Sequence, residues 1–315
     1  MNGYSLNKTD GYHKYELDSL KWEITLSVML EDPGGPCRSV LVKSDSFGNL
    51  LYDFIATVIP MDRVRYLIEI GGGYGYLMRD FLKRNKMLSA TMVDLSSFLL
   101  ERQRETLQEF AVKFVLGDFF EMDDSILSNI DLVILNEVIG DFPTICQVPR
   151  NVLLESSDPV DSLLREVRRI YESYEIAIPV AEHFTVNLGA IQALEKLCKH
   201  RIPYIYVSEH SCETRVPERM MSRMELRSTG EPERIKLRGH DEYTIRFSDL
   251  ERIAASFGYA SKRGQYFDFI EPVIEGEVSL ILCLDASRTA RQEIIGQFVA
   301  DLVKYEYLIL ILPTQ

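Results

Sequence analysis

Short apolar segments alternate with longer, amphipathic ones between residues 63 and 137. The apolar segments are RVRYLIEI at 63–70, SATMVDL at 89–95, AVKFVLGD at 111–118 and IDLVILNE at 130–137. Amphipathic stretches typical of helices, such as YLMRDFLKRN, separate them. This alternation is typical of βαβ units, in which helices cover both faces of a parallel sheet. We therefore predict an α/β fold whose centre is a seven-strand, Rossmann-like sheet.

The pattern is less regular on either side of this region. Apolar spacing and the prolines that follow it predict two earlier helices, at 10–31 and at 46–59. The later elements are expected in this order: helices at 158–173 and 187–200, a strand at 202–210, a helix at 248–257, and strands near 266–271 and at 277–285. We divide the chain into an N-terminal helical segment, 1–62, and a Rossmann-like domain, 63–315, with an inserted helical or irregular cap at about 150–201 and a loop at about 211–242.

Composition and charge narrow the possible partners. Hydrophobic residues make up 46% of the 315 residues, and 48 acidic against 35 basic residues give a net charge of -13. Because a net anion repels phosphate backbones, we expect no nucleic-acid partner. The five cysteines are scattered and never spaced C-x-x-C, which favours a reducing cytoplasm and argues against a zinc ribbon. We expect a cytoplasmic protein with no metal and no membrane partner, because no apolar stretch is long enough to cross a bilayer.

A glycine-rich loop follows the first predicted strand and opens a helix. Glu69 precedes it by two positions, and Gly71, Gly73 and Gly75 give the spacing G-x-G-x-G. The dinucleotide fingerprint has its third glycine one position later, which disfavours an NAD-dependent oxidoreductase, and no P-loop Lys-Ser/Thr follows. The loop resembles motif I of class I S-adenosylmethionine-dependent methyltransferases. A tight turn without a ligand is the alternative.

The ends of the next two strands carry acids at the positions where such a cofactor needs them. Asp94 is placed to accept hydrogen bonds from both ribose hydroxyls, and Leu95 beside it to contact the adenine. Asp118 is placed to bind the adenine amino group, with the Phe119 ring against the base. A helix cap at Asp94 and an ordinary turn at Asp118 are the structural alternatives.

The fourth strand ends in Asn136 and Glu137, with Asp141 shortly after. The carboxyl end of a parallel strand is where α/β enzymes place groups that face the substrate. An Asn-Glu pair is costly to bury there without partners. The alternative is that Glu137 caps the following turn.

In their joint order these motifs resemble the MidA-like methyltransferases, the family that includes the mitochondrial complex I assembly methyltransferase. The matching segments are 44–48 (SDSFG), 69–77 around the glycine loop, 136–143 (NEVIGDFP) and 239–250 (GHDEYTIRFSDL). The resemblance implies S-adenosylmethionine as cofactor, bound also by Asn136, and a protein arginine as methyl acceptor. It places Glu137 first, and Asp141 second, as the carboxylate that orients the guanidinium.

Three departures from the family pattern concern mainly the acceptor. Gly72 and Tyr74 replace a Pro and an Arg of the loop, Gly140 stands where the family has Asp, and VSEH at 207–210 replaces a sequence like I-D-Y-G. They keep open a non-catalytic assembly or binding protein on a methyltransferase fold. His210 and His240 are possible proton acceptors or structural histidines. The charged stretch at 213–242 is either a solvated loop or a basic surface that contacts the substrate.

Overall fold

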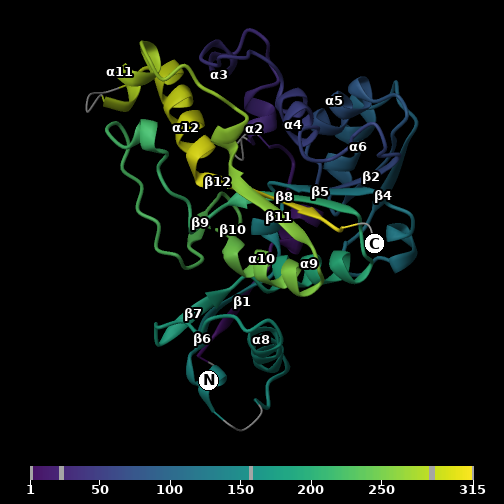
Figure 1. Ribbon diagram of the computed structural model, residues 1–315, viewed down its shortest axis with the longest axis vertical. Helices are drawn as coiled ribbons and strands as arrows, with labels where there is room; N and C mark the ends of the chain where they lie inside the picture. The colour runs from purple at the N-terminus through teal and green to yellow at the C-terminus, as the bar shows by residue number, and fades with distance from the viewer. Residues whose placement is uncertain (1–2, 21–24, 156–158, 284–287, 314–315) are drawn as a thin grey trace.

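A seven-strand sheet forms the centre of the computed structural model, which describes residues 3–20, 25–155, 159–283 and 288–313 (Figure 1). The sheet consists of β2 (Tyr66–Ile70), β3 (Ser89–Asp94), β4 (Val112–Leu116), β5 (Leu132–Asn136), β8 (Tyr204–His210), β11 (Ala260–Gln265) and β12 (Tyr305–Ile311). Its order is β11-β12-β8-β5-β2-β3-β4. The five strands from β8 to β4 are parallel, and β12 runs antiparallel to both of its neighbours. The predicted α/β fold and the adjacency of the first four strands are confirmed.

Helices cover both faces of this sheet because alternate strand residues point to opposite sides. In β2, Leu67 belongs to one apolar core, whereas Ile68 and Ile70 belong to the other. The first core packs under α4 (Phe47–Ile55), α5 (Tyr76–Arg84), α6 (Ser97–Thr106) and α12 (Ala290–Lys304). The second packs under α8 (Ser162–Ser173), α9 (Leu188–Lys199) and α10 (Phe247–Ser256). No helix among the described residues is both long and apolar enough to cross a membrane.

Two small sheets lie outside the central one. The first pairs β1 (Ser5–Asn7) with β6 (Thr144–Pro149), and β6 with β7 (His183–Val186), all antiparallel. It projects with α8 from the lower end of the molecule in Figure 1, after the short α7 (Asn151–Leu154). The second is the hairpin of β9 (Arg234–Lys236) and β10 (Asp241–Tyr243), preceded by η3 (Glu218–Met220). The N-terminus therefore pairs with a segment about 140 residues later in the chain.

Several predicted elements at the ends of the chain are wrong. The helix expected at 10–31 is α1 (Asp10–Tyr15) and α2 (Leu26–Met29), with 21–24 outside the described residues. The strand expected at 277–285 is α11 (Glu277–Cys283), with 284 and 285 outside them, because a short apolar run does not distinguish a buried strand from a helix. The strand expected near 266–271 lies earlier, as β11, and η4 (Tyr266–Asp268) follows it. The polar sequence ASKRGQ of β11, at the sheet edge, gave no strand pattern.

Candidate active site

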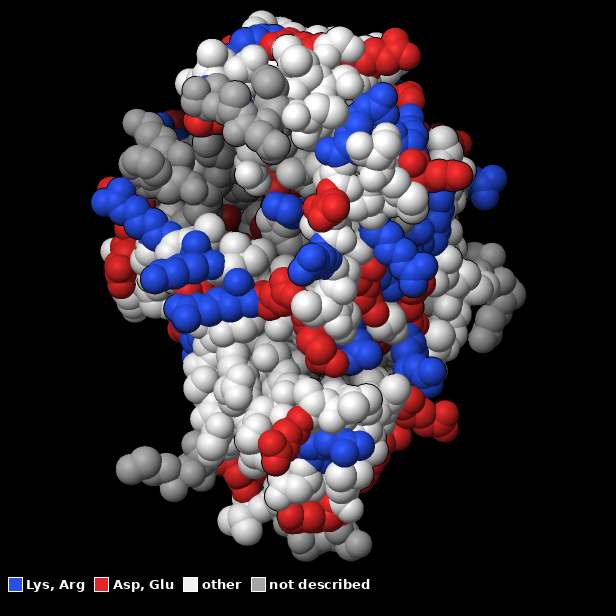
Figure 2. All heavy atoms as spheres, turned by 90° about the vertical axis from the view of Figure 1, so that its left-hand side faces the viewer, with Lys and Arg blue, Asp and Glu red and all other residues white. Residues whose placement is uncertain are grey.

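A cavity of about 750 Å³ opens at the carboxyl ends of the parallel strands. Its lining comes from the glycine loop, the ends of β3, β5 and β8, parts of 8–20 and 25–29, the hairpin region and the end of α12. The surface is hollowed on the face that Figure 2 shows. This is the place and the size range in which α/β folds bind small ligands.

The glycine loop lines this cavity with backbone atoms that carry no side chains. Gly71, Gly73 and Gly75 have φ angles of 66°, 52° and 80°, in the left-handed region that other residues rarely adopt. A Cβ on Gly71 would lie 2.4 Å from Val138 Cγ2, and one on Gly72 would lie 2.4 Å from Met92 Cε. The predicted loop residues therefore form a turn in which side chains do not fit, at the beginning of α5.

Two buried acids lie beneath the loop. Burial raises the pKa of Glu69 to about 8, and the nearby Asp94 adds to this shift. Burial also raises the pKa of Asp94 to about 6, against hydrogen bonds that this carboxylate accepts from the Ser96 N–H (2.9 Å) and Gln103 Nε2 (2.7 Å). Gln103 Nε2 also donates to the Gly73 carbonyl at 3.1 Å. Gln103, which sequence reasoning missed, thus connects the loop to the acid.

The residues predicted to surround the adenine line the same cavity. They are Leu95, Asp118 and Phe119, at the ends of β3 and β4. Asp118 accepts a hydrogen bond from the Phe120 N–H at 2.9 Å. Phe119 is 5% exposed, and Lys196 Nζ lies 5.1 Å from its ring centroid. The structure brings these side chains to the side of the cavity opposite β8.

Asn136 and Glu137 lie at the end of β5, with fixed orientations. Asn136 Oδ1 accepts hydrogen bonds from Ser208 Oγ and the Tyr266 hydroxyl, each at 3.0 Å. Its Nδ2 donates to Glu137 Oε1 at 3.3 Å, which holds the two neighbours together. Glu137 has a φ of 53°, a left-handed backbone conformation that is strained for a residue with a side chain. Strain of this kind is concentrated at functional sites.

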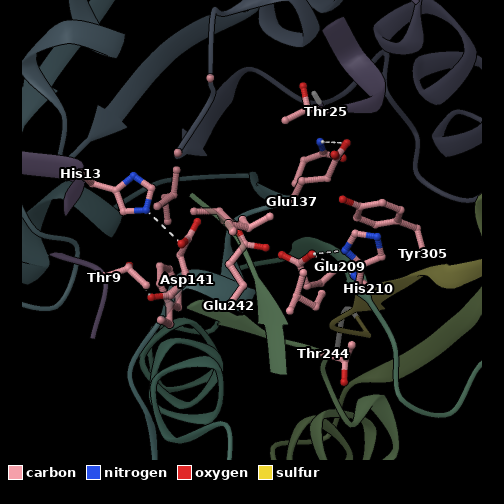
Figure 3. A pocket seen from close by; sticks show the side chains of 18 of the residues that line it. Thr9, His13, Thr25, Glu137, Asp141, Glu209, His210, Glu242, Thr244 and Tyr305 are labelled. Carbon is pink, nitrogen blue, oxygen red and sulfur yellow. Dashed lines mark hydrogen bonds and ion pairs between the residues drawn. The ribbon is translucent and has the colours of Figure 1, made fainter. Parts of the chain in front are cut away.

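The Glu137 carboxyl is buried but not isolated. Burial raises its pKa to about 7, and hydrogen bonds from the Leu26 N–H, the Tyr305 hydroxyl and Asn136 lower it in part. The Leu26 bond is 3.2 Å long and brings the N-terminal segment to the end of β5. Figure 3 shows Glu137 beside Tyr305, with both side chains in the cavity.

Glu209, at the end of β8, is a second buried acid on this side. Its Oε1 accepts from the His210 N–H at 2.9 Å and its Oε2 from the Gly140 N–H at 3.1 Å. Burial raises its pKa well above the ordinary value, and Glu242 and Glu137 raise it further. The VSEH segment, which departs from the family pattern, therefore supplies a cavity carboxyl. From the sequence, this segment is only a departure from the family pattern, and Glu209 is not named there as a site residue.

Asp141 lies apart from Glu137, among imidazoles. Its Oδ1 is 2.9 Å from His13 Nε2 and 3.3 Å from His240 Nε2. Burial alone would raise the pKa of Asp141, but the two imidazoles hold it well below its usual range. His210, by contrast, packs on the Tyr305 ring, at 3.8 Å between centroids.

Charges of both signs are interleaved in the polar stretch at 213–242. Arg234 pairs with Asp241, Arg219 pairs with Glu271, and Arg227 lines the cavity. Figure 2 shows Lys and Arg in small groups beside Asp and Glu on this face. The arrangement is that of a charged loop at the cavity mouth rather than of one continuous basic surface.

Comparisons with known proteins agree with this geometry. A family model described as "Putative S-adenosyl-L-methionine-dependent methyltransferase" matches residues 54–158. No curated protein matches the chain. The fold is similar to the crystal structure of an uncharacterized protein from Burkholderia thailandensis, with a TM-score of 0.50 and 15% identity over 93% of this chain and 88% of that one. A second member of that protein's superfamily, from the same organism and bound to S-adenosyl-homocysteine, gives a TM-score of 0.49 and 14% identity over 85% and 77%.

These findings bear on three predictions. The resemblance to S-adenosylmethionine-dependent methyltransferases is confirmed by the family model over residues 54–158, and the solved structure with a TM-score of 0.50 shows the same fold. The predicted enzyme class, a methyltransferase of Rossmann-like fold, and its cofactor, S-adenosylmethionine, are confirmed by the family model. The acceptor and the role of each site residue stay predictions.

Proposed function

We propose that this chain transfers the methyl group of S-adenosylmethionine to a cationic nitrogen acceptor, the guanidinium of a protein arginine. The observation that carries the proposal is the charge of the cavity. Among the described residues that line it, carboxyl side chains outnumber Lys and Arg side chains by eleven to four. Several of these carboxyls are held at raised pKa values, as at Glu137 and Glu209. A guanidinium would favour their ionised forms and be bound by them.

The cofactor fits the other side of the same cavity. Gly71, Gly72 and Gly73 line this side without side chains, and Glu69 Oε2 is buried without a hydrogen-bond partner in the described chain. In this proposal Gly71 to Gly75 hold the methionine part, Asp94 the ribose, and Asp118, Leu95 and Phe119 the adenine. When bound, S-adenosylmethionine supplies a methyl group on a sulfonium, whose intrinsic reactivity needs mainly orientation and a desolvated site.

Glu137 has the better position for the acceptor. It is fixed by Leu26, Asn136 and Tyr305, and it faces the cavity next to the Glu209 carboxyl (Figure 3). Its carboxylate orients the guanidinium by paired hydrogen bonds. As the guanidinium nitrogen gains the methyl carbon and the carbon–sulfur bond breaks, that nitrogen loses a proton. A carboxylate with a pKa of about 7 is matched to accept this proton near neutral pH. Asp141, the second choice, is instead engaged with His13 and His240.

We also propose that the protein acts in the cytoplasm and that its partner is a protein substrate. The five cysteines carry free thiols, as in a reducing cytoplasm, and acidic side chains outnumber basic ones in the cavity lining, which favours a basic protein segment over nucleic acid.

The acceptor class is tested with a labelled methyl group. Purified protein is incubated with methyl-labelled S-adenosylmethionine and a proteome extract, and labelled peptides are identified by mass spectrometry. We expect methylarginine, lost with Glu137→Gln and retained with Glu121→Gln, an exposed cavity acid changed in the same way. Label on hydroxyl or carboxyl groups would contradict the guanidinium acceptor, and label on lysine would retain the cationic pocket but change its occupant.

A further inference from the structure

His13, Asp141 and His240 converge at the edge of the cavity, outside the set of residues that the methyl transfer uses. His13 lies on α1, Asp141 in the turn η2 (Ile139–Asp141) after β5, and His240 in the β9–β10 hairpin. Their nearest ligand atoms all lie within 4.8 Å of one another. Three chain segments that are remote in sequence thus place two imidazoles and one carboxylate together. Figure 3 shows His13 directed at Asp141.

The spacing of these atoms suits a metal ion. Metal bonds of about 2.0 to 2.2 Å place neighbouring ligand atoms about 2.8 to 3.1 Å apart in octahedral coordination and about 3.3 to 3.6 Å apart in tetrahedral coordination. Asp141 Oδ1 is 2.9 Å from His13 Nε2 and 3.3 Å from His240 Nε2. A cation close to all three atoms would require only small side-chain movements. Two imidazoles and a carboxylate form a ligand set for Zn²⁺, Fe²⁺ or Mn²⁺, and not one that favours Mg²⁺.

The surroundings hold these side chains in place. Tyr12 stacks on His240 with ring centroids 4.3 Å apart, and the Thr9 hydroxyl donates to the Asp141 carbonyl at 2.8 Å. Gly239, with a φ of 99°, makes room for this stack, because a Cβ there would lie 2.6 Å from the Tyr12 ring. Glu242 Oε1 lies 3.5 Å from His240 Nε2 and brings a second negative charge to the cluster. The arrangement is a supported, largely buried group with the charge a divalent cation requires.

We propose that His13, Asp141 and His240 form a binding site for a first-row divalent cation of the Zn²⁺ class. The ion fastens α1 to the end of β5 and to the β9–β10 hairpin, so that the N-terminal residues are fixed along the cavity. Lys8, Thr9, Asp10, His13 and Lys14 all line that cavity. The site goes beyond the methyl transfer and departs from the metal-free protein that the cysteine pattern predicts.

The first test measures binding of the metal alone. Full-length protein is stripped with a chelator and titrated with Zn²⁺ against a chromophoric competitor, and with Co²⁺ by visible absorption. We expect one ion per chain and no thiolate charge-transfer band, since no cysteine belongs to the cluster. His13→Gln and His240→Gln should each weaken the affinity by about 10²-fold or more, because even outer partners of a ligand contribute about 10- to 100-fold. His200→Gln, a histidine paired with Asp124 elsewhere, is the matched control.

The second test reports where the ion sits and keeps the proposal falsifiable if His240→Gln unfolds. Zn²⁺ should slow hydrogen exchange of α1 amides, such as the Glu16 N–H that donates to the Tyr12 carbonyl, in the natural protein. The slowing should disappear in His13→Gln, a change on the short α1 that leaves His240 itself in the hairpin. Absence of one-to-one binding would overturn the proposal, leaving a plain histidine–aspartate ion pair. Equal affinity in both variants and the control, or binding without protection of α1, would overturn it as well.

Discussion

The two sides of the cavity are built in different ways. The cofactor side, at the ends of β2, β3 and β4, is formed by the glycine loop, the acids Glu69 and Asp94 beneath it, and Asp118 with Phe119. The acceptor side, at the ends of β5, β8 and β12, is crowded with ionisable side chains: Glu137, Glu209, Asp301, Tyr305 and His210. On this second side the backbone is strained at Glu137, and carboxyls repel one another.

The difference follows from the two ligands. S-adenosylmethionine brings its own reactivity, so the residues around it need only shape and a few hydrogen bonds. An acceptor nitrogen must be oriented and must lose a proton, which requires groups whose pKa values lie near neutrality. Burial of several acids together supplies such values on the acceptor side, at a cost in stability.

The largest expected effect is a loss of methyl transfer after a substitution at Glu137, on the acceptor side of the cavity. Glu137→Gln keeps the shape and the hydrogen-bonding capacity but removes the charge that orients a guanidinium. Methyl transfer should fall by about 10²-fold or more, equivalent to about 2.7 kcal/mol in activation free energy. Cofactor affinity should hardly change, because the side chain faces the acceptor. Single-turnover rates and calorimetric titration with S-adenosylmethionine measure the two quantities separately.

Transfer at the natural rate in this variant would make Glu137 a turn-capping residue. The acceptor side would then be organised around Glu209, and the same substitution at that position would carry the loss. If Glu137→Gln weakened cofactor binding and left methyl transfer unchanged, Glu137 would belong to the cofactor side. The distinction between a cofactor side and an acceptor side would then not hold.

The next effect concerns the cofactor side. Asp94→Ala should weaken S-adenosylmethionine binding by about 1.5 to 3 kcal/mol, the range for losing charge-assisted hydrogen bonds. Asp123→Ala, which removes an acid that accepts from the Ser125 N–H in a similar turn outside the cavity, should leave the affinity unchanged. Calorimetry measures both, with circular dichroism as the check on folding. Natural affinity in a folded Asp94→Ala protein would mean that Asp94 only holds the turn before α6, through the bond that it accepts from the Ser96 N–H.

An effect of intermediate size tests how the acceptor side sets the pKa of Glu137. The Tyr305 hydroxyl bond lowers the pKa of Glu137, so Tyr305→Phe should raise that pKa above about 7. Methyl transfer near neutral pH should then fall by roughly fivefold, the equivalent of about 1 kcal/mol for one hydrogen bond. The rising limb of the pH–rate profile should move to higher pH, so that alkaline pH restores much of the activity. A uniform loss at all pH values would instead indicate a packing defect around Tyr305.

The difference between the cofactor side and the acceptor side also explains which site residues could be predicted from the sequence. The cofactor side comes from one stretch, 69–119, in which glycine spacing and acids at strand ends form local motifs. All of its predicted residues line the cavity except Gly75, which begins α5. That β2 to β5 form adjacent parallel strands was predictable because strands and helices alternate along this stretch, but the place of β5 beside β2 is set by the tertiary fold.

The acceptor side combines residues far apart in the chain. Glu137 follows a motif and was predicted, but Glu209 and Tyr305 become neighbours only because β12 pairs with β8 across the sheet. The missed elements α12 and β12 and the polar edge strand β11 have the same cause: their environment is set by tertiary contacts rather than by local pattern. The cluster at His13 and Asp141 likewise joins residues 128 positions apart.

The smallest expected effect returns to the cofactor side and concerns the ionisation of Glu69. Glu69 is protonated below its pKa of about 8 and charged above it, and a sulfonium favours the charged form. The affinity for S-adenosylmethionine should therefore rise severalfold between about pH 7 and pH 9, with proton release on binding at the lower pH. S-adenosylhomocysteine has the same amino and carboxyl groups without the sulfonium charge, so its affinity should change less. Calorimetry in buffers of different ionisation enthalpy measures the released proton, and Glu69→Gln should abolish the difference between the two ligands. Equal pH dependence for both ligands in the natural protein would show that Glu69 does not sense the sulfonium, and that charge matters on the acceptor side alone.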